Sequence, residues 1–436
     1  MTARSAPSPA AAGIGTDDAL GQGVPIHVIA ATVAGNALEF FDFITYAFFA
    51  VYIGQAFFPA RTPFMSLLLS VGVFGVGFVF RPLGGVLIGA YADRAGRRPA
   101  MLLTITLITV GTMGLALTPS YAAIGIAAPL IVVFCRLVQG LALGGEVGPA
   151  TSFLIEVAPP GKRGLYSSWQ SASQGIAALV AGALGLTLSL LLSPADLAAW
   201  GWRLPFLFCL ALIPLAFFLR RAMPETLERG PAGADPQRAR LVAHARLVVL
   251  AVLLILGGTV STYVGTYMTT YAITTLKFPA STALAVTVVL GSANLIFALT
   301  GGWLSDRYGR RPIMLIPRIL VAVVIWPLFW LLNAFPSAAT LFLATAVLAG
   351  LSAVSAAASL VVLPELLPRS VRAAGLSISY AVGVSLFGGT TQFIITYLIG
   401  VTGDPTSPAW YVIITSVITV CAMLALPESR GRTLEN

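Results

Sequence analysis

Charged residues are scarce in this chain, since Asp, Glu, Lys and Arg together make up only 9% of its 436 residues. Soluble globular domains contain about 25% charged residues, so this scarcity excludes an ordinary soluble domain. Hydrophobic residues make up 58% of the sequence, and the mean hydropathy is +0.92. The composition therefore predicts an integral membrane protein.

Histidine and cysteine are also rare, with 2 and 3 residues respectively. Cys135, Cys209 and Cys421 fall in apolar segments without pair spacing, which indicates packing residues and neither a disulfide framework nor a metal site. His27 and His244 each stand alone, and no nucleophile accompanies them. We therefore expect no enzyme activity, no metal and no cofactor.

Long apolar segments predict the fold. A helix needs about 20 apolar residues to cross a hydrocarbon layer about 30 Å thick. Twelve segments meet this need, near residues 27–53, 66–90, 100–118, 124–153, 165–192, 201–220, 243–274, 282–304, 312–333, 339–364, 372–400 and 408–427. We predict an all-α membrane protein with two six-helix bundles at 26–220 and 243–428, a cytoplasmic linker at 221–242, a disordered cytoplasmic tail at 1–25 and a second tail at 429–436.

The net charge of +9 is concentrated on one side of this topology. Arg61 and Lys277 lie on the opposite side, and four arginines lie inside spans, namely Arg81, Arg136, Arg203 and Arg318. The remaining Lys and Arg occupy the tails and alternate loops, which places both termini in the cytoplasm by the positive-inside rule. The net positive charge is therefore explained by the orientation of the chain in the membrane, and it indicates no nucleic-acid partner. Arg318 follows Arg311 closely enough to extend to the cytoplasmic surface, so we leave it out of the predicted pocket.

A polar turn between two apolar runs occurs twice. The copy at 89–98 and the copy at 302–311 share their Gly, Asp and Arg positions in register, which indicates a duplicated half. Singly, these arginines need only hold a loop on the cytoplasmic side. The whole pattern resembles the signature loop of the major facilitator superfamily, in which its Asp and Arg bridge neighbouring helices. The resemblance implies a cytoplasmic gate made of Asp93, Arg94, Arg97, Arg98, Asp306, Arg307, Arg310 and Arg311.

Two carboxylates lie deep in the first span. Asn36, Glu39, Asp42 and Tyr46 fall within a wedge of about 120° on a helix and form one polar face. Ionisable groups at this depth are costly and usually face a cavity. They are either structural partners of arginines on other helices or, for at least one of them, the group that carries a proton. The candidates for proton coupling are Glu39, Asp42 and, on the fourth span, Glu146.

Two of the buried arginines need an anion, because neither reaches water easily from its span. Arg81 lies midway along the second span, and Arg136 lies in the fourth with Gln139 on the same face. Glu146 is about 15 Å from Arg136 along one helix, so partners on the first helix suit both better. The glycines of this span, Gly140, Gly144 and Gly145, permit close helix approach. The string Arg-x-x-Gln-Gly resembles the fourth-helix motif of the superfamily that is associated with proton coupling.

Further polar residues extend the candidate pocket. The fifth span opens with Gln170, Ser171 and Gln174, which is more amide and hydroxyl than packing requires. Tyr267 belongs to a hydroxyl-rich stripe on the seventh span, which either ties helices together or lines a pocket. Arg203, at the outer start of the sixth span, either sits at the lipid headgroups or captures substrate from outside.

Several strings together resemble the metabolite:proton symporter family of that superfamily. They are Gly35-Asn36-x-x-Glu39-x-x-Asp42, Arg81-Pro82-Leu83-Gly84 and Trp202-Arg203-x-Pro205. More narrowly, the segments 169–174 and 402–410 resemble those of bacterial citrate and tricarballylate:proton symporters. The fifth span lacks the Gly-Pro-x-x-x-Gly-Gly string of exporters in this superfamily, which favours import.

The resemblance implies a monomeric transporter of the bacterial inner membrane that imports an organic polyanion, above all citrate or a related tricarboxylate, with protons by alternating access. Entry of each negative charge is opposed by about 2.3 kcal/mol per 100 mV, so accompanying protons are needed. Arginines bind carboxylates bidentately. The predicted substrate contacts are Arg81, Arg136, Arg203, Gln139, Gln170, Ser171, Gln174 and Tyr267. The alternatives are a symporter for a dicarboxylate, a shikimate-like acid or a compatible solute, and a proton-driven exporter.

Overall fold

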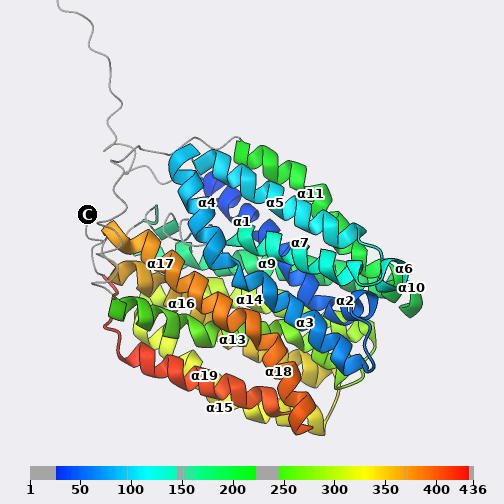
Figure 1. Ribbon diagram of the computed structural model, residues 1–436. Helices are drawn as coiled ribbons and strands as arrows, with labels where there is room; N and C mark the ends of the chain where they lie inside the picture. The colour runs from blue at the N-terminus through cyan, green and yellow to red at the C-terminus, as the bar shows by residue number, and fades with distance from the viewer. Residues whose placement is uncertain are drawn as a thin grey trace, which may run out of the picture.

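The computed structural model describes residues 26–95, 97–144, 151, 154–155, 157–159, 161–221, 245–367 and 369–431. These residues form helices that lie side by side and are joined by short turns at both ends of the molecule (Figure 1). The predicted first tail, Glu146 and the predicted linker after residue 221 lie outside the described residues.

The helices fall into two groups that follow one another in the sequence. The first half contains α1 (Ile26–Phe48), α2 (Ala50–Phe57), α3 (Pro63–Val79), α4 (Arg81–Ala95), α5 (Arg97–Leu117), α6 (Tyr121–Ile124), α7 (Ala127–Leu143), α9 (Arg163–Leu191), α10 (Pro194–Ala199), the 3₁₀ turn η1 (Gly201–Arg203) and α11 (Leu204–Arg221). The second half contains α13 (Ala245–Thr274), α14 (Ala280–Tyr308), α15 (Arg310–Ala334), α16 (Ala338–Leu366), α17 (Arg369–Gly383), the π-helical turn η2 (Val384–Gly388), α18 (Gly389–Thr402) and α19 (Ser407–Leu424).

The lengths of these helices match a membrane-spanning fold. Within the described residues, eight helical segments are long and apolar enough to cross a membrane, and α1 with α2 adds a ninth that is bent by 67°. Three shorter apolar helices, at Leu102–Leu117, Ala127–Leu143 and Gly201–Pro214, coincide with the predicted third, fourth and sixth spans. In a bilayer the backbone must bond internally, which favours helices of this kind. The predicted all-α fold with twelve spans in two bundles is confirmed.

The two halves are held together mainly by α9 and α14, which pack along much of their length. Small residues allow this approach. A Cβ atom at Gly175 would lie 2.6 Å from the backbone nitrogen of Leu295, and one at Gly291 would overlap the backbone of Leu179. Helix α3 also contacts α18, and α1 contacts α13. Figure 1 shows the first half, blue to green, stacked above the second half.

The two ends of the molecule differ in their residues. The end that we call the basic end contains Arg163 at the start of α9, Arg310 at the start of α15 and residues 428–430 after α19. The opposite end contains the short helices α6 and α10, at the right of Figure 1.

Glycines also bring α7 against α3 and α4. A Cβ atom at Gly140 would overlap the carbonyl oxygen of Gly77, and a Cβ atom at Gly144 would overlap that of Arg81. The expected close approach at Gly140 and Gly144 is therefore confirmed, while Gly145 lies outside the described residues. This contact matters for the site because it fixes α7, which carries Arg136, against α4, which begins with Arg81.

We predict that Gly140→Ala destabilises the protein. Alanine favours a helix over glycine by roughly 0.5–1 kcal/mol, but overpacking a tight contact costs about 1–3 kcal/mol, so the net effect is a loss. Gly72→Ala is the matched control, since a Cβ there would meet only the Phe393 ring at 3.5 Å. Thermal unfolding of the purified protein in detergent measures both. Equal midpoints for the two variants would contradict the prediction.

Candidate functional site

A cavity of about 100 Å³ lies between the two halves. Its wall is mixed apolar and polar, and it comes from α1 and α9 on one side and from α13 to α17 and η2 on the other. Among the described residues that line it, Arg318 is the one charged side chain. The polar lining residues are Ser171, Gln174, Thr259, Thr262, Tyr263, Asn294, Arg318, Ser359 and Tyr380.

The three predicted pocket residues of α9 do not all face the cavity. Ser171 and Gln174 line the cavity, and the Tyr380 hydroxyl lies within hydrogen-bonding reach of Gln174. Gln170 instead faces α1, where its Nε2 donates to Asn36 Oδ1 at 3.0 Å. Neighbouring positions on a helix point about 100° apart, which explains the separation. Gln170 therefore ties α1 to α9, and its predicted role in substrate binding stays a prediction.

A buried polar cluster joins α1 to α7 inside the first half. Gln139 Nε2 donates to Asp42 Oδ2 at 2.7 Å, and Arg136 Nη1 donates to Gln139 Oε1 at 2.7 Å. Arg136 Nη1 also lies 3.9 Å from Asp42 Oδ2. The expectation that Arg136 has its partner on the first helix is confirmed. The amide of Gln139 thus relays the interaction between a carboxylate and a guanidinium that are both almost fully buried.

This cluster keeps unused hydrogen-bonding capacity. Within the described residues, Asp42 Oδ1 and Arg136 Nε and Nη2 are buried without a hydrogen-bond partner, and the Arg136 guanidinium lies 4.3 Å from the Tyr46 ring centroid. A charged pair that retains open donors and acceptors can change partners when a proton or an anion arrives. In this conformation the cluster lies outside the lining of the cavity.

Arg81 lies directly behind one wall of the cavity. Its guanidinium lies 4.2 Å from the Phe78 ring centroid and is within hydrogen-bonding reach of the Tyr263 hydroxyl. Tyr263 and Tyr380 both line the cavity, and both lie beside Arg81. The two tyrosines of the second half therefore separate Arg81 from the cavity.

The remaining predicted residues lie apart from the cavity lining. Glu39 is buried on α1, within electrostatic reach of Arg81 and beside a small apolar space against α5 and α11. Tyr267 accepts a hydrogen bond from Thr396 Oγ1 at 2.9 Å. Arg203, near the opposite end, donates to the carbonyl oxygens of Ala199 at 3.0 Å and Thr118 at 3.1 Å. Their predicted roles in proton coupling and substrate binding stay predictions.

Arg318 is a functional candidate that the sequence pattern did not place in the pocket. Its side chain is only 1% exposed and does not extend to the surface of the basic end, so that expectation is wrong. Nη1 donates to the Gly257 carbonyl oxygen at 2.8 Å and to Ser261 Oγ at 2.9 Å. Arg318 stays inside the bundle because its side chain reaches α13, where the Gly257 carbonyl oxygen and the Ser261 hydroxyl accept its hydrogen bonds. The sequence pattern gave no signal for this contact, because the two acceptors lie 61 and 57 residues earlier in the chain.

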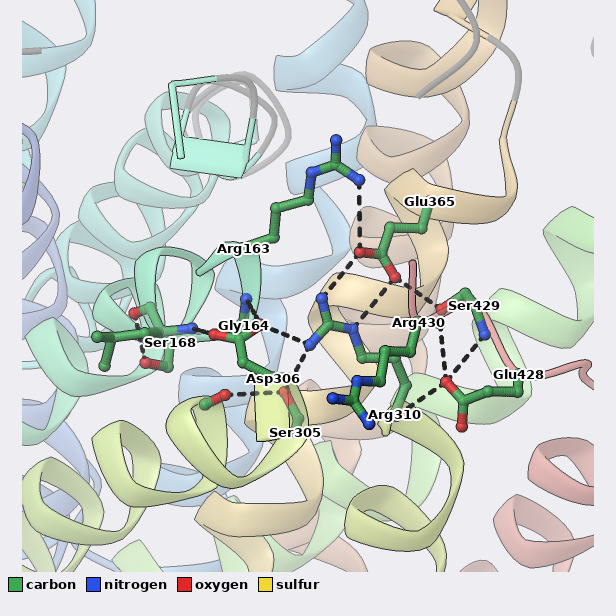
Figure 2. A network of polar contacts seen from close by, with 12 residues as sticks. Arg163, Gly164, Ser168, Ser305, Asp306, Arg310, Glu365, Glu428, Ser429 and Arg430 are labelled. Atoms are coloured by element: carbon green, nitrogen blue, oxygen red, sulfur yellow. Dashed lines mark hydrogen bonds and ion pairs between the residues drawn. The ribbon is translucent and has the colours of Figure 1, made fainter. Parts of the chain in front are cut away.

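A polar network joins the two halves at the basic end (Figure 2). Asp306 on α14 accepts hydrogen bonds from the backbone N–H of Gly164 at 2.8 Å and of Leu165 at 2.9 Å. These N–H groups begin α9 and have no partner within their own helix, and the helix dipole adds a positive partial charge there. A carboxylate of the second half therefore caps a helix of the first.

Arg310 and Glu365 extend this network within the second half. Arg310 Nη1 donates to Asp306 Oδ1 at 2.7 Å, while Nε and Nη2 donate to the two oxygens of Glu365 at 3.2 and 3.0 Å. Ser429 Oγ donates to Glu365 at 2.7 Å, and Arg163 of α9 lies 4.0 Å from the same carboxylate. Figure 2 shows these side chains converging from α9, α14, α15, α16 and the segment after α19.

The Glu428 carboxylate anchors the segment after α19 to the start of α15. Burial alone would raise the pKa of Glu428, but backbone N–H groups of Arg310, Arg311, Ser429 and Arg430 hold that pKa below its usual range. Glu365 and Glu428 are absent from the gate predicted from the sequence. Both stand in motifs that recur in the two halves, at Glu156 and Glu225, and this recurrence was the signal.

The other predicted gate residues are placed differently. Arg311 donates from its backbone N–H to Glu428, and Arg307 lies over the Trp303 ring at 5.6 Å on the surface. The side chains of the first copy, Asp93, Arg94, Arg97 and Arg98, lie outside the described part of the structure. The gate therefore stays a prediction, while its second copy provides the observed contacts.

The chain was compared with known proteins. The family model described as "Sugar (and other) transporter" matches residues 27–229 and 237–436. The citrate-proton symporter of Klebsiella pneumoniae is 38% identical over 92% of this chain and 91% of its own length. The citrate-proton symporter of Salmonella typhi is 37% identical over 91% of this chain and 93% of its own length.

The fold has a counterpart among solved structures. A crystal structure of a D-xylose-proton symporter superposes with a TM-score of 0.74 at 18% sequence identity, covering 94% of this chain and 99% of that one. The architecture, the family model and the similar chains agree on a transporter rather than an enzyme. The chain belongs to the sugar (and other) transporter family, within the major facilitator fold.

Proposed function

We propose that this protein imports citrate or a closely related tricarboxylate together with protons. The observation that carries the proposal is the 37–38% identity, over more than nine-tenths of the chain, to two proteins named citrate-proton symporters. The chemistry of the interior is compatible with such cargo. Arg318 is the only charge among the described residues that line the cavity, Arg81 lies beside the cavity-lining Tyr263, and Arg136 is buried within the first half.

The coupling role is assigned to the cluster of Asp42, Gln139 and Arg136. Protonation of Asp42 at the open Oδ1 neutralises the charge that holds Gln139 and Arg136 in place. Arg136 then has a weaker protein partner and can bind a substrate carboxylate when the cavity extends toward it. Glu39, within electrostatic reach of Arg81, is the second candidate for a proton site. Arg203 is a weaker substrate contact, because both its bonds go to backbone carbonyls.

The orientation and the gate complete the proposal. The basic end faces the cytoplasm of a bacterium, with both termini there, because cations accumulate on the cytoplasmic side of inner-membrane proteins. The network around Asp306, Arg310 and Glu365 is the cytoplasmic gate, and it opens when α9 and α14 separate at that end. Residues 26–220 and 243–428 move as the two bundles about the central cavity. The functional unit is a single chain, since one chain surrounds the cavity.

Uptake of radiolabelled citrate into proteoliposomes tests the proposed function. We expect accumulation when the outside is more acidic than the inside, and loss of accumulation when an uncoupler removes the proton gradient. Competition by unlabelled tricarballylate should be strong, whereas betaine and shikimate should compete weakly. Uptake that ignores the pH gradient, or competition dominated by a zwitterion, would contradict the proposal.

Asp42→Asn should separate transport from proton coupling. Asparagine keeps the size and an acceptor for Gln139 but cannot take up a proton, so the accumulation ratio should fall to about 1. Exchange of external labelled citrate for internal unlabelled citrate should persist, because exchange needs no net proton movement. Asp196→Asn is the control, since Asp196 is exposed and its carboxylate accepts a local hydrogen bond from the Ser193 hydroxyl. Gradient-driven accumulation that survives in Asp42→Asn would assign coupling elsewhere.

Asp306→Asn should weaken closure of the basic end. The amide retains one oxygen acceptor and loses the charge that two backbone N–H groups and Arg310 share. We expect a loss of about 1–3 kcal/mol from the conformation described here. Labelling of a single cysteine introduced at Ser168, which lies beside Gly302, should become faster. Asp196→Asn again serves as the control, and an unchanged labelling rate in Asp306→Asn would contradict the gate.

A further inference from the structure

We infer that Arg318 is the residue of the second half that binds a carboxylate of the transported anion, through the edge of its guanidinium formed by Nε and Nη2. The inference rests on the proposed function for the identity of the anion. It assigns a binding residue on α15, a helix that contributes nothing to the pocket predicted from the sequence.

The two edges of the Arg318 guanidinium have different surroundings. Nη1 is occupied, because it donates to the Gly257 carbonyl oxygen and to Ser261 Oγ. Nε is buried and has no hydrogen-bond partner in the part of the chain that the structure describes. Nη2 has no hydrogen-bond partner among the described residues, and it lies beside Gly258, where a Cβ atom would be at an ordinary contact distance of 3.5 Å. The protein thus holds one nitrogen by hydrogen bonds and leaves the N–H groups of the other two without an acceptor.

The available edge is the one that recognises carboxylates. Nε and Nη2 present two parallel N–H groups that match the two oxygens of a carboxylate. The same edge of Arg310, eight positions earlier on α15, donates to both oxygens of Glu365 at 3.2 and 3.0 Å. One helix therefore carries two buried arginines of which one has its carboxylate within the protein. For Arg318, none of the described acidic side chains lies within ion-pairing distance.

The cavity beside Arg318 suits an organic anion. No Asp or Glu is found among its described lining residues, so nothing there repels negative charge. Asn294, Thr262 and Ser359 offer amide and hydroxyl groups from the second half. Ser171 and Gln174 offer the same from the first half. A buried cation without an anion is costly, and an arriving carboxylate removes that cost while touching both halves.

Binding of citrate to the purified full-length protein, measured by calorimetry, tests the inference. Arg318→Gln should raise the Kd by about 30-fold or more, since removing one partner of a buried charged pair has an effect of that size. Arg318→Lys, which keeps the charge and loses the two-point edge, should raise the Kd by about tenfold. Arg61→Gln removes one exposed positive charge at the opposite end and should leave the Kd within about twofold.

A second readout separates binding from folding. The thermal midpoint of the ligand-free Arg318→Lys variant should equal that of the wild type, while citrate should raise it less. A Kd for Arg318→Lys and Arg318→Gln within threefold of the wild-type value would overturn the inference. Weaker binding that is accompanied by an equally lowered ligand-free midpoint in both variants would also overturn it, because the role would then be structural.

The identity of the anion is tested in the same assay. If citrate does not bind the wild type, the proposed substrate fails. Tricarballylate, 2-oxoglutarate and succinate are then tested, and a thermal shift that disappears in Arg318→Gln still supports the role of Arg318. If none of these carboxylates shifts the wild-type midpoint, the inference fails as well.

Discussion

The structure depends on how the arginines buried in its interior are neutralised. A guanidinium removed from water loses several kcal/mol of solvation, and the described residues solve this problem differently at each site. Arg136 contacts an amide and a carboxylate, and Arg81 lies against aromatic rings and beside a tyrosine hydroxyl. Arg203 donates hydrogen bonds to backbone carbonyl oxygens. Arg318 is satisfied on one nitrogen only. Arg136 is also hydrogen-bonded through one nitrogen, but the Asp42 carboxylate lies 3.9 Å away, whereas Arg318 has no ion-pair partner among the described residues.

The same reasoning explains the position of the cavity. Helices α9 and α14 pack too closely for a cavity to form between them, because glycines bring their backbones together. The open space lies beside this contact, where the tyrosines of α13 and α17 and the arginine of α15 meet α1 and α9. The network around Asp306, Arg310 and Glu365 closes the basic end of the same contact. A close pair of helices that is joined by a polar network at one end is well suited to be the contact about which the two halves rotate.

Much of the architecture was predictable from one-dimensional patterns, and less of the site was. The spans, the repeated turn and the pairing of Arg136 with the first helix were all predictable, because apolar length, repetition and the cost of buried charge depend on residue type and order alone. The direction in which each polar side chain points was not predictable from the sequence. Gln170 and Ser171 are adjacent in sequence, yet one contacts Asn36 and the other lines the cavity. Glu365 and Glu428 were missed because their partners lie on α15, far away in the chain.

The sequence by itself determined that this chain is a duplicated membrane transporter, since its composition leaves no soluble core and its motifs recur in both halves. It also determined that arginines and carboxylates must meet within the bundle, because single charges are not stable there. Only the tertiary structure decided which arginine faces the cavity. That choice depends on how α15 packs against α13, because Gly257 and Ser261 of α13 anchor Arg318 at the edge of the space shared by both halves.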